Sequence, residues 1–276
     1  MSFSFWARAP RGVGLGDVLA PALRAGASTV EDDVGAAEYT HVYLPGVSTR
    51  GVEVYREDQD VVVRLLTCSA PGEYALGVFL ARTAAELSGT EVRSEHGWQG
   101  APASVQDEYG AAWIAGEVAS GARIALTLAD ERGPLTMGGP VRNFHLGARL
   151  AAELRAAGPE DGLADRLLAA VRRAQWPGDR YYSATTMRLT GKSSGNSVSF
   201  AVWSPVACVL PDVEVVVMHG DNLDTTVPVA LDSVPLIAGP LCTRLDERQL
   251  LLEPVPDEDW PAMRTAAGRY RVELPP

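Results

Sequence analysis

The chain has 276 residues, of which 46% are apolar and 21% charged, and its formal net charge is −11. These proportions are those of a folded globular protein and argue against an intrinsically disordered chain. The acidic balance argues against a general nucleic-acid binder, because sequence-independent affinity for phosphates comes from clustered Lys and Arg.

The first third of the chain shows both strand and helix periodicity. Valines alternate with charged or polar residues over 50–55 and 61–66, which predicts a hairpin with one face in the core and the other in water. Pro71 begins a helix and Gly89 ends it. The apolar residues expected to face inward from this helix are Leu76, Phe79, Leu80, Ala84 and Leu87. The other elements expected here are a strand at Phe3 and Phe5, a turn over 12–16, a short helix begun by Asp17 and a strand over 40–44.

Helical patterns dominate the middle of the chain. Residues 105–129 have helical spacing, although three glycines leave open whether they form one helix or two shorter ones. Two further helices are expected over 147–157 and 161–176, where Gly-Pro and Pro-Gly pairs mark their ends.

After Asp179 the sequence becomes rich in strand patterns. A last helix is expected near 257–267, with acidic residues in its first turn as the helix dipole favours. The strands expected in this part cover 181–189, 197–203, 213–218, 227–231 and 250–253.

The order of these elements predicts the fold class. Strands and helices do not strictly alternate, which favours an α+β fold with largely antiparallel sheets and helices packed on one side. The best boundary lies near Gly133, which gives an N-terminal α+β lobe of residues 1–133 and a C-terminal α+β lobe of residues 134–276. No low-complexity linker divides the chain, so one continuous compact domain is the alternative.

Three nucleotide-binding or catalytic motifs are nearly present, and each fails at a decisive residue. Residues 12–17 have Asp17 where the dinucleotide fingerprint needs its third glycine. Ser48 resembles the serine of a nucleophile elbow, but Arg50 replaces the closing glycine, so a turn is the better interpretation. Residues 191–193 imitate the end of a P-loop without its first glycine and are expected to form a hairpin turn.

Possible metal ligands are densest in one short segment. His219, Asp221 and Asp224 follow an expected strand and offer one imidazole and two carboxylates. The alternative is a solvated connection, because turns favour Asp and Asn for backbone reasons.

Basic residues are concentrated in the middle of this acidic chain. Residues 142–192 contain eight arginines and one lysine against five acidic residues, a net charge of +4. Arginines in such a cluster bind carboxylate- or phosphate-bearing partners. The alternative is that they pair within the chain, for example Arg149 with Glu153 one helical turn away. The candidate partner-binding residues are Arg142, Arg149, Arg166, Arg172, Arg173 and Arg180.

Cysteine spacing and the first residues indicate the compartment. Cys68, Cys208 and Cys242 form no CxxC pair and leave one thiol over, which is typical of neither a disulfide framework nor a zinc cluster. The N-terminus lacks the pattern of a secretion signal, and no apolar run reaches the length of a membrane span. We therefore expect a cytoplasmic protein without a cofactor or a membrane association.

Several short segments in the first 100 residues resemble a bacterial family of unknown function, the domain-of-unknown-function 4299 family. The matching segments are residues 1–5, 39–42, 48–54, 62–64, the helix over 76–87 and residues 94–97. The resemblance implies a bacterial, cytosolic α+β protein. It supplies no catalytic residues.

These observations favour a protein that works by binding. We expect a non-enzymatic cytoplasmic protein that binds another protein, such as an immunity or accessory factor of a toxin, secretion or defence system, because acidic surfaces complement basic partners. One alternative is a metal-assisted hydrolase that uses His219, Asp221 and Asp224. Another is a structural subunit of a larger assembly.

Overall fold

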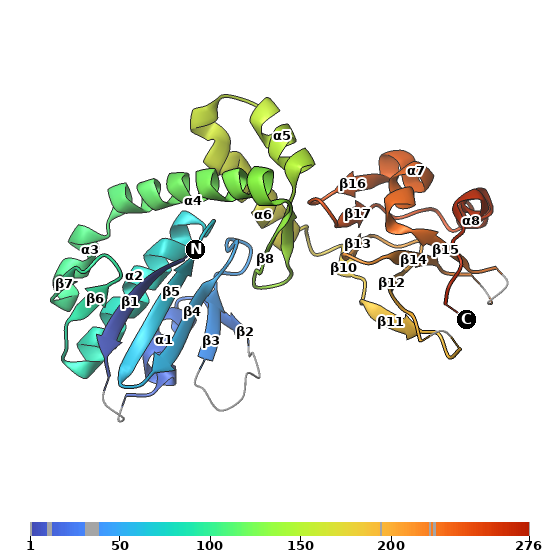
Figure 1. The fold of residues 1–276 in the computed structure, drawn as a ribbon. Coiled ribbons are helices and arrows are strands. Elements are labelled where there is room, and N and C mark those ends of the chain that lie inside the picture. Colours follow the sequence, from blue (N-terminus) through green and yellow to red (C-terminus); the bar gives the residue numbers. More distant parts are fainter. Residues whose placement is uncertain are drawn as a thin grey trace. The chain divides into compact units, whose positions relative to one another are not determined.

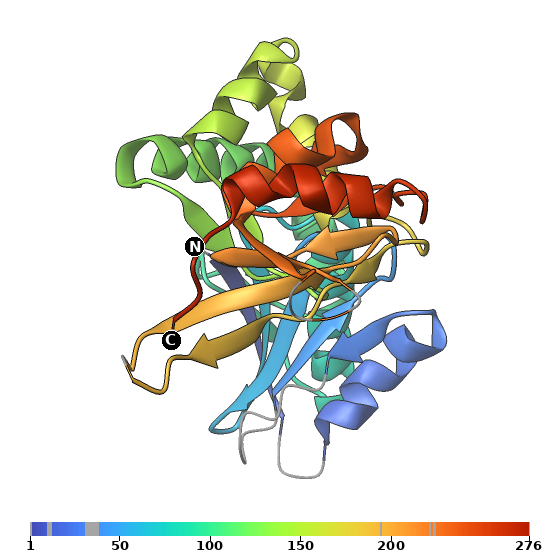
Figure 2. The ribbon, with the colours of Figure 1, turned by 90° about the vertical axis from the view of Figure 1, so that its right-hand side faces the viewer.

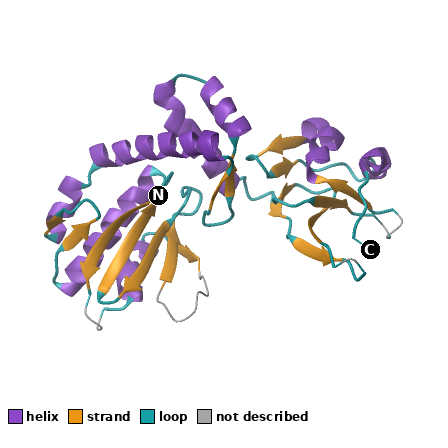
Figure 3. Ribbon diagram, viewed as in Figure 1, coloured by secondary structure: helices purple, strands orange, loops and turns teal. Residues whose placement is uncertain are grey.

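The fold is given by a computed structural model, which describes residues 2–9, 13–30, 39–193, 195–220, 222 and 225–275. The chain divides into two compact units, Met1–Trp176 and Pro177–Pro276. Both units combine helices with largely antiparallel sheets (Figures 1 and 3), which confirms the expected α+β class.

The first unit is built on a seven-stranded antiparallel sheet with the order β2-β3-β4-β5-β1-β6-β7. The predicted hairpin, β4 and β5, lies inside this sheet, where Val54 stands opposite Val63. The strands are β1 (Ser2–Arg8), β2 (Ser28–Val30), β3 (Tyr39–Tyr43), β4 (Val52–Glu57), β5 (Asp60–Leu66), β6 (Val92–Ser94) and β7 (Gln99–Gly100).

Helices α1 (Leu15–Arg24) and α2 (Pro71–Ser88) pack on one face of this sheet and lie behind it in the view of Figure 1. Gly77 allows close packing, since a Cβ there would lie 2.6 Å from the Leu65 side chain. Helix α2 ends as predicted, at Gly89 with a left-handed φ of 64°. Helix α1 begins two residues before Asp17, whose carboxylate instead accepts a hydrogen bond from the Gly14 amide at 3.0 Å.

The remaining helices of the first unit explain where it ends. The region over 105–129 forms two helices, α3 and α4, which settles the alternative left open by its glycines. Helix α4 then contacts the next hairpin and both following helices, so the unit continues to Trp176 rather than ending at residue 133. These elements are α3 (Val105–Glu108), α4 (Ala111–Arg132), β8 (Leu135–Met137), β9 (Phe144–Leu146), α5 (Ala148–Ala156) and α6 (Leu163–Gln175).

The second unit has two four-stranded sheets, with the orders β10-β13-β17-β16 and β11-β12-β14-β15. The strand expected over 181–189 is divided, because β10 and β11 join different sheets. The strands are β10 (Tyr182–Ser183), β11 (Met187–Thr190), β12 (Ser197–Trp203), β13 (Cys208–Leu210), β14 (Val215–Met218), β15 (Val227–Ala230), β16 (Cys242–Arg244) and β17 (Leu250–Leu252).

Helices α7 (Val234–Ala238) and α8 (Trp260–Ala267) complete this unit, and Figure 2 shows α8, in red, beside its strands. The unit has its own buried core, in which the rings of Trp203 and Trp260 pack edge to face with 5.2 Å between their centroids. Single 3-10 turns occur at Pro102–Ser104, Glu160–Gly162, Leu231–Ser233, Gly239–Leu241 and Gly268–Tyr270. None of the helices in the described ranges combines the length and apolar character needed to cross a membrane.

Candidate functional site

An apolar surface with adjoining hollows lies beside α2 in the first unit; the first hollow lies along α2, and the other two meet α2 only at its first turn. The three hollows have volumes of about 310, 410 and 260 Å³. The first two hollows share Ala111 and Ile114, and the second and third share Pro71 and Asp165. We term this surface the α2 groove. Each of its three walls presents one helix face at i, i+4 and i+8: Pro71, Ala75 and Phe79 from α2, Ala111, Ala115 and Ala119 from α4, and Ala164, Leu168 and Arg172 from α6.

The lining of the α2 groove is mostly apolar and solvent-accessible. The Phe79 side chain is 41% exposed although the sequence predicted it to face inward, and Leu87 on the same helix is 49% exposed. Helix α2 is apolar on most of its circumference, so periodicity alone did not distinguish its outer from its inner residues. The exposed residues of the groove therefore belong to a surface rather than to the core.

Four charged side chains border the groove within the described residues: Arg82, Asp161, Asp165 and Arg172. Arg82 pairs with Glu86 one turn further along α2, with 2.7 Å between Nε and Oε1. Asp161 and Asp165 are exposed, and neither forms an ion pair with a cation in the part of the chain that the structure describes. The second hollow thus has two carboxylates at its edge without a neutralising partner.

A buried carboxylate fixes the loop at the end of the groove. Glu73 is fully buried, and its side chain accepts hydrogen bonds from Thr49 Oγ1 at 2.7 Å, from the amides of Thr49 and Arg50 at 3.1 and 2.9 Å, and from the amides of Gly51 and Ala70. We term these five residues the Glu73 centre. Because Ala70 precedes α2, the same carboxylate holds both the 49–51 loop and the first turn of α2.

Ser48 and Arg50 are bound into this scaffold. Ser48 is buried, and its hydroxyl accepts a hydrogen bond from the Leu44 amide at 2.8 Å, as expected for a turn residue. Arg50 donates through Nη1 to the Thr67 carbonyl at 2.9 Å. Burial lowers the pKa of the Arg50 guanidinium. The segment that resembles a nucleophile elbow therefore has a structural role.

The nearby cysteine does not have the properties of a nucleophile. Burial raises the pKa of the Cys68 thiol to about 11, so the thiol stays protonated at neutral pH. His41 lies on the same unit but uses Nε2 to bond the Arg50 carbonyl at 2.6 Å. A Cys–His pair is therefore not assembled from these two residues.

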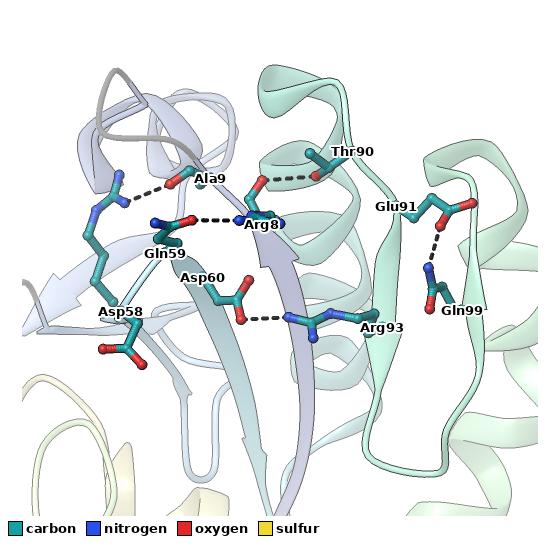
Figure 4. Close-up of a pocket in the computed structure, with 10 residues that line it drawn as sticks. Arg8, Ala9, Asp58, Gln59, Asp60, Thr90, Glu91, Arg93 and Gln99 are labelled. Atoms are coloured by element: carbon teal, nitrogen blue, oxygen red, sulfur yellow. Dashed lines mark hydrogen bonds and ion pairs between the residues drawn. The ribbon is translucent and has the colours of Figure 1, made fainter.

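A second, polar cleft of about 1180 Å³ lies at the tip of the β4–β5 hairpin (Figure 4). In the described lining, three arginines stand against three acidic residues. Arg93 Nη2 lies 2.5 Å from Asp60 Oδ2, and Arg8 Nη2 donates to Gln59 Oε1 at 2.8 Å. Since the charges are balanced and partly paired, this cleft presents no concentrated charge of one sign.

The six candidate arginines are distributed over both units, and several of them bond to groups of their own unit. Arg149 pairs with Glu153 at 2.8 Å, which confirms the pairing named as the alternative. Arg142 and Arg166 donate to the carbonyls of Ala174 and Leu154 at 2.6 and 2.7 Å. Arg180 is in the second unit, where it pairs with Glu253 at 2.8 Å.

The last two arginines of the set are on α6, and only one of them lines the groove. Arg172 borders the third hollow. Arg173, on the same helix, is exposed. The candidate set thus contributes Arg172 to the α2 groove, while Arg142, Arg149, Arg166 and Arg180 bond to groups within their own units.

The proposed metal ligands are only partly described. His219 follows β14 and is exposed, and its carbonyl accepts a hydrogen bond from Trp260 Nε1 at 2.9 Å. Asp221 and Asp224 lie outside the described residues. Within the described ranges, no three His, Cys, Asp or Glu side chains gather as a metal site would require. The hypothesis that uses all three residues stays a prediction.

Comparison of the chain with protein-family models, with curated proteins and with solved structures gave no match. The resemblance to the domain-of-unknown-function 4299 family stays a prediction. A proposal for the function therefore rests on the chemistry of the protein surface.

Sequence reasoning missed the α2 groove. The signal present in the sequence was the spacing of Ala111, Ala115 and Ala119, which places three small side chains on one face of α4. That stripe is equally compatible with a buried helix contact. The sequence did not show that α2 and α6 stand beside this face and leave it open.

Proposed function

We propose that this chain is a non-enzymatic, cytoplasmic bacterial protein that acts by binding another protein, in the manner of an immunity or accessory factor of a toxin, secretion or defence system. The observation that carries the proposal is the α2 groove, a run of three apolar hollows on the surface of the first unit. Contiguous exposed apolar surface, bordered by polar groups, marks sites of protein contact.

Charge supports the same proposal. The chain has a net charge of −11, and a field of one sign steers oppositely charged proteins toward it. The immunity or accessory role follows by analogy with acidic proteins that cover basic surfaces on their partners. A basic partner protein is therefore the best candidate.

Site-specific photocrosslinking in the native host tests this function. The photoreactive residue p-benzoylphenylalanine replaces Phe79, whose exposed ring it resembles, in the full chain at near-native expression. The matched control replaces Leu236, which is 65% exposed and belongs to the second unit. We expect a protein adduct at position 79 and none at position 236. Recovery of no adduct at either position, together with a pull-down that recovers no partner, contradicts protein binding.

A further inference from the structure

Resting on the proposed function, we infer that the occupant of the α2 groove is an amphipathic helix of the partner, with its apolar face toward the groove and a basic side chain beside Asp161 and Asp165 at the edge of the second hollow. The inference names the shape and the charge of the bound segment. It follows from three features: walls that offer few hydrogen-bond partners to a bound main chain, the small side chains of these walls, and the two carboxylates.

The walls of the groove require a bound segment whose backbone is already hydrogen-bonded. The walls are mainly helices, with Val47 and Thr49 of the loop before β4 at the third hollow, and the groups they present to the groove are mainly apolar side chains. An extended peptide would bury main-chain N–H and C=O groups against these walls without partners, which is costly. A helix satisfies its main chain internally, and helix-in-groove binding is an established mode of recognition.

The dimensions of the groove also fit a helix. Pro71 and Phe79 are eight residues apart on α2, which corresponds to about 12 Å along the helix axis at 1.5 Å per residue. Ala115 and Ala164 line the middle of the groove, and side chains of this size permit the interaxial distances of about 8 to 10 Å found between packed helices. The hollows of about 310 and 410 Å³ leave room for large apolar side chains of the bound helix.

The charges at the border indicate where a basic side chain of the bound helix would lie. Asp161 and Asp165 border the second hollow and have no cation partner among the described residues. Beside the first hollow, Arg82 is paired with Glu86, with 2.7 Å between Nε and Oε1. Arg172 lies seven residues after Asp165 on α6, about 10 Å away along the helix, so it does not occupy the position of the expected cation. The bound helix is therefore expected to place Lys or Arg beside the two aspartates.

Two synthetic helical peptides of about 15 residues test the inference with the full chain. Both carry leucines on one face, and their polar faces carry only lysine in one peptide and only glutamate in the other. Binding is measured by isothermal titration calorimetry at low salt. We expect the lysine peptide to bind about tenfold more tightly than the glutamate peptide, and the double variant Asp161→Asn with Asp165→Asn to remove most of this difference.

A matched pair of substitutions on α4 tests the location. Ala115→Gln places a polar side chain in the groove and is expected to weaken both peptides at least about fivefold. Ala112→Gln, exposed on the same helix outside the groove lining, is expected to change neither affinity. Unchanged far-UV circular dichroism and an unchanged thermal midpoint establish that both variants are folded.

Three results overturn the inference. The bound helix is excluded if neither peptide binds while the position 79 crosslink still forms, a result that leaves the proposed function intact. The basic polarity is excluded if both peptides bind equally and the double asparagine variant changes nothing. The location is excluded if Ala115→Gln leaves both affinities unchanged.

Discussion

At the scale of single residues, the Glu73 carboxylate connects two segments that are separate in the sequence. It accepts hydrogen bonds from the 49–51 loop and from Ala70 at the start of α2. Hydrogen bonds to an ionised acceptor are stronger than neutral ones, and the N-terminal end of a helix favours a negative charge. These donors compensate a charge that would otherwise be costly to bury.

Replacement of this carboxylate tests its structural role. Glu73→Ala removes the common acceptor of four backbone amides, while the Thr49 hydroxyl keeps the Cys68 carbonyl as an acceptor at 2.8 Å. We therefore expect the free energy of unfolding to fall by about 3 kcal/mol or more. Urea denaturation of the full chain measures this change. Glu86→Gln, on the exposed side of the same helix, is the control and is expected to cost less than about 0.5 kcal/mol. Equal shifts of the two midpoints would show that Glu73 contributes no more than a surface pair.

The sequence predicted part of this centre. The missing glycine at Arg50 correctly indicated that Ser48 is a turn residue. Glu73 itself was not identified, because most of its donors are backbone amides, which a sequence pattern does not display. Its position three residues after a helix N-cap is a capping signal, but the N-cap is Ala70 rather than the usual Ser or Thr.

At the scale of elements, long periodic segments were predictable and short ones were not. Helix α6 and the β4–β5 hairpin lie where the apolar spacing placed them. Strands such as β7 and β13 have only two and three residues, too few for an alternating pattern to appear. Gly116 and Gly121 made a single helix over α4 less certain from the sequence, because glycine disfavours helix, yet one helix spans both. The two glycines have different surroundings.

These two glycines provide a prediction within one helix. Gly116 has open space around it, so Gly116→Ala is expected to stabilise the protein by about 0.5 to 1 kcal/mol through helix propensity. A Cβ on Gly121 would lie 3.3 Å from the Cys68 backbone nitrogen, tighter than an ordinary contact, so Gly121→Ala is expected to gain nothing or to destabilise. Thermal unfolding of both variants measures the difference. A greater stabilisation from Gly121→Ala would contradict the packing given for α4.

At the scale of the whole molecule, the division into units depends on contacts that the sequence does not reveal. The chain passes from Trp176 to Pro177 without a flexible linker, so composition gave no boundary there. The Gly133-Pro134 step is a strong local turn signal, but α4 before it packs against α5 and α6 after it. The same tertiary packing creates the α2 groove, which is why neither feature was predictable from local patterns.

The two possible boundaries make different predictions for fragments. Cutting after Trp176 keeps each buried core intact, so fragments 1–176 and 177–276 are both expected to unfold cooperatively in urea. Cutting after Gly133 separates α4 from α5 and α6 and exposes Leu126 and Leu167, which are 1% and 0% exposed in the intact unit. Fragment 1–133 is therefore expected to unfold without cooperativity in urea and to bind a dye for exposed apolar surface.

Fragment 134–276 provides a second measurement. Its α5–α6 segment is expected to be cleaved rapidly by protease while residues 177–276 resist, because only residues 177–276 keep a complete core. Equal cooperativity of fragments 1–133 and 1–176 would place the boundary at residue 133 and remove α6 from the folded groove.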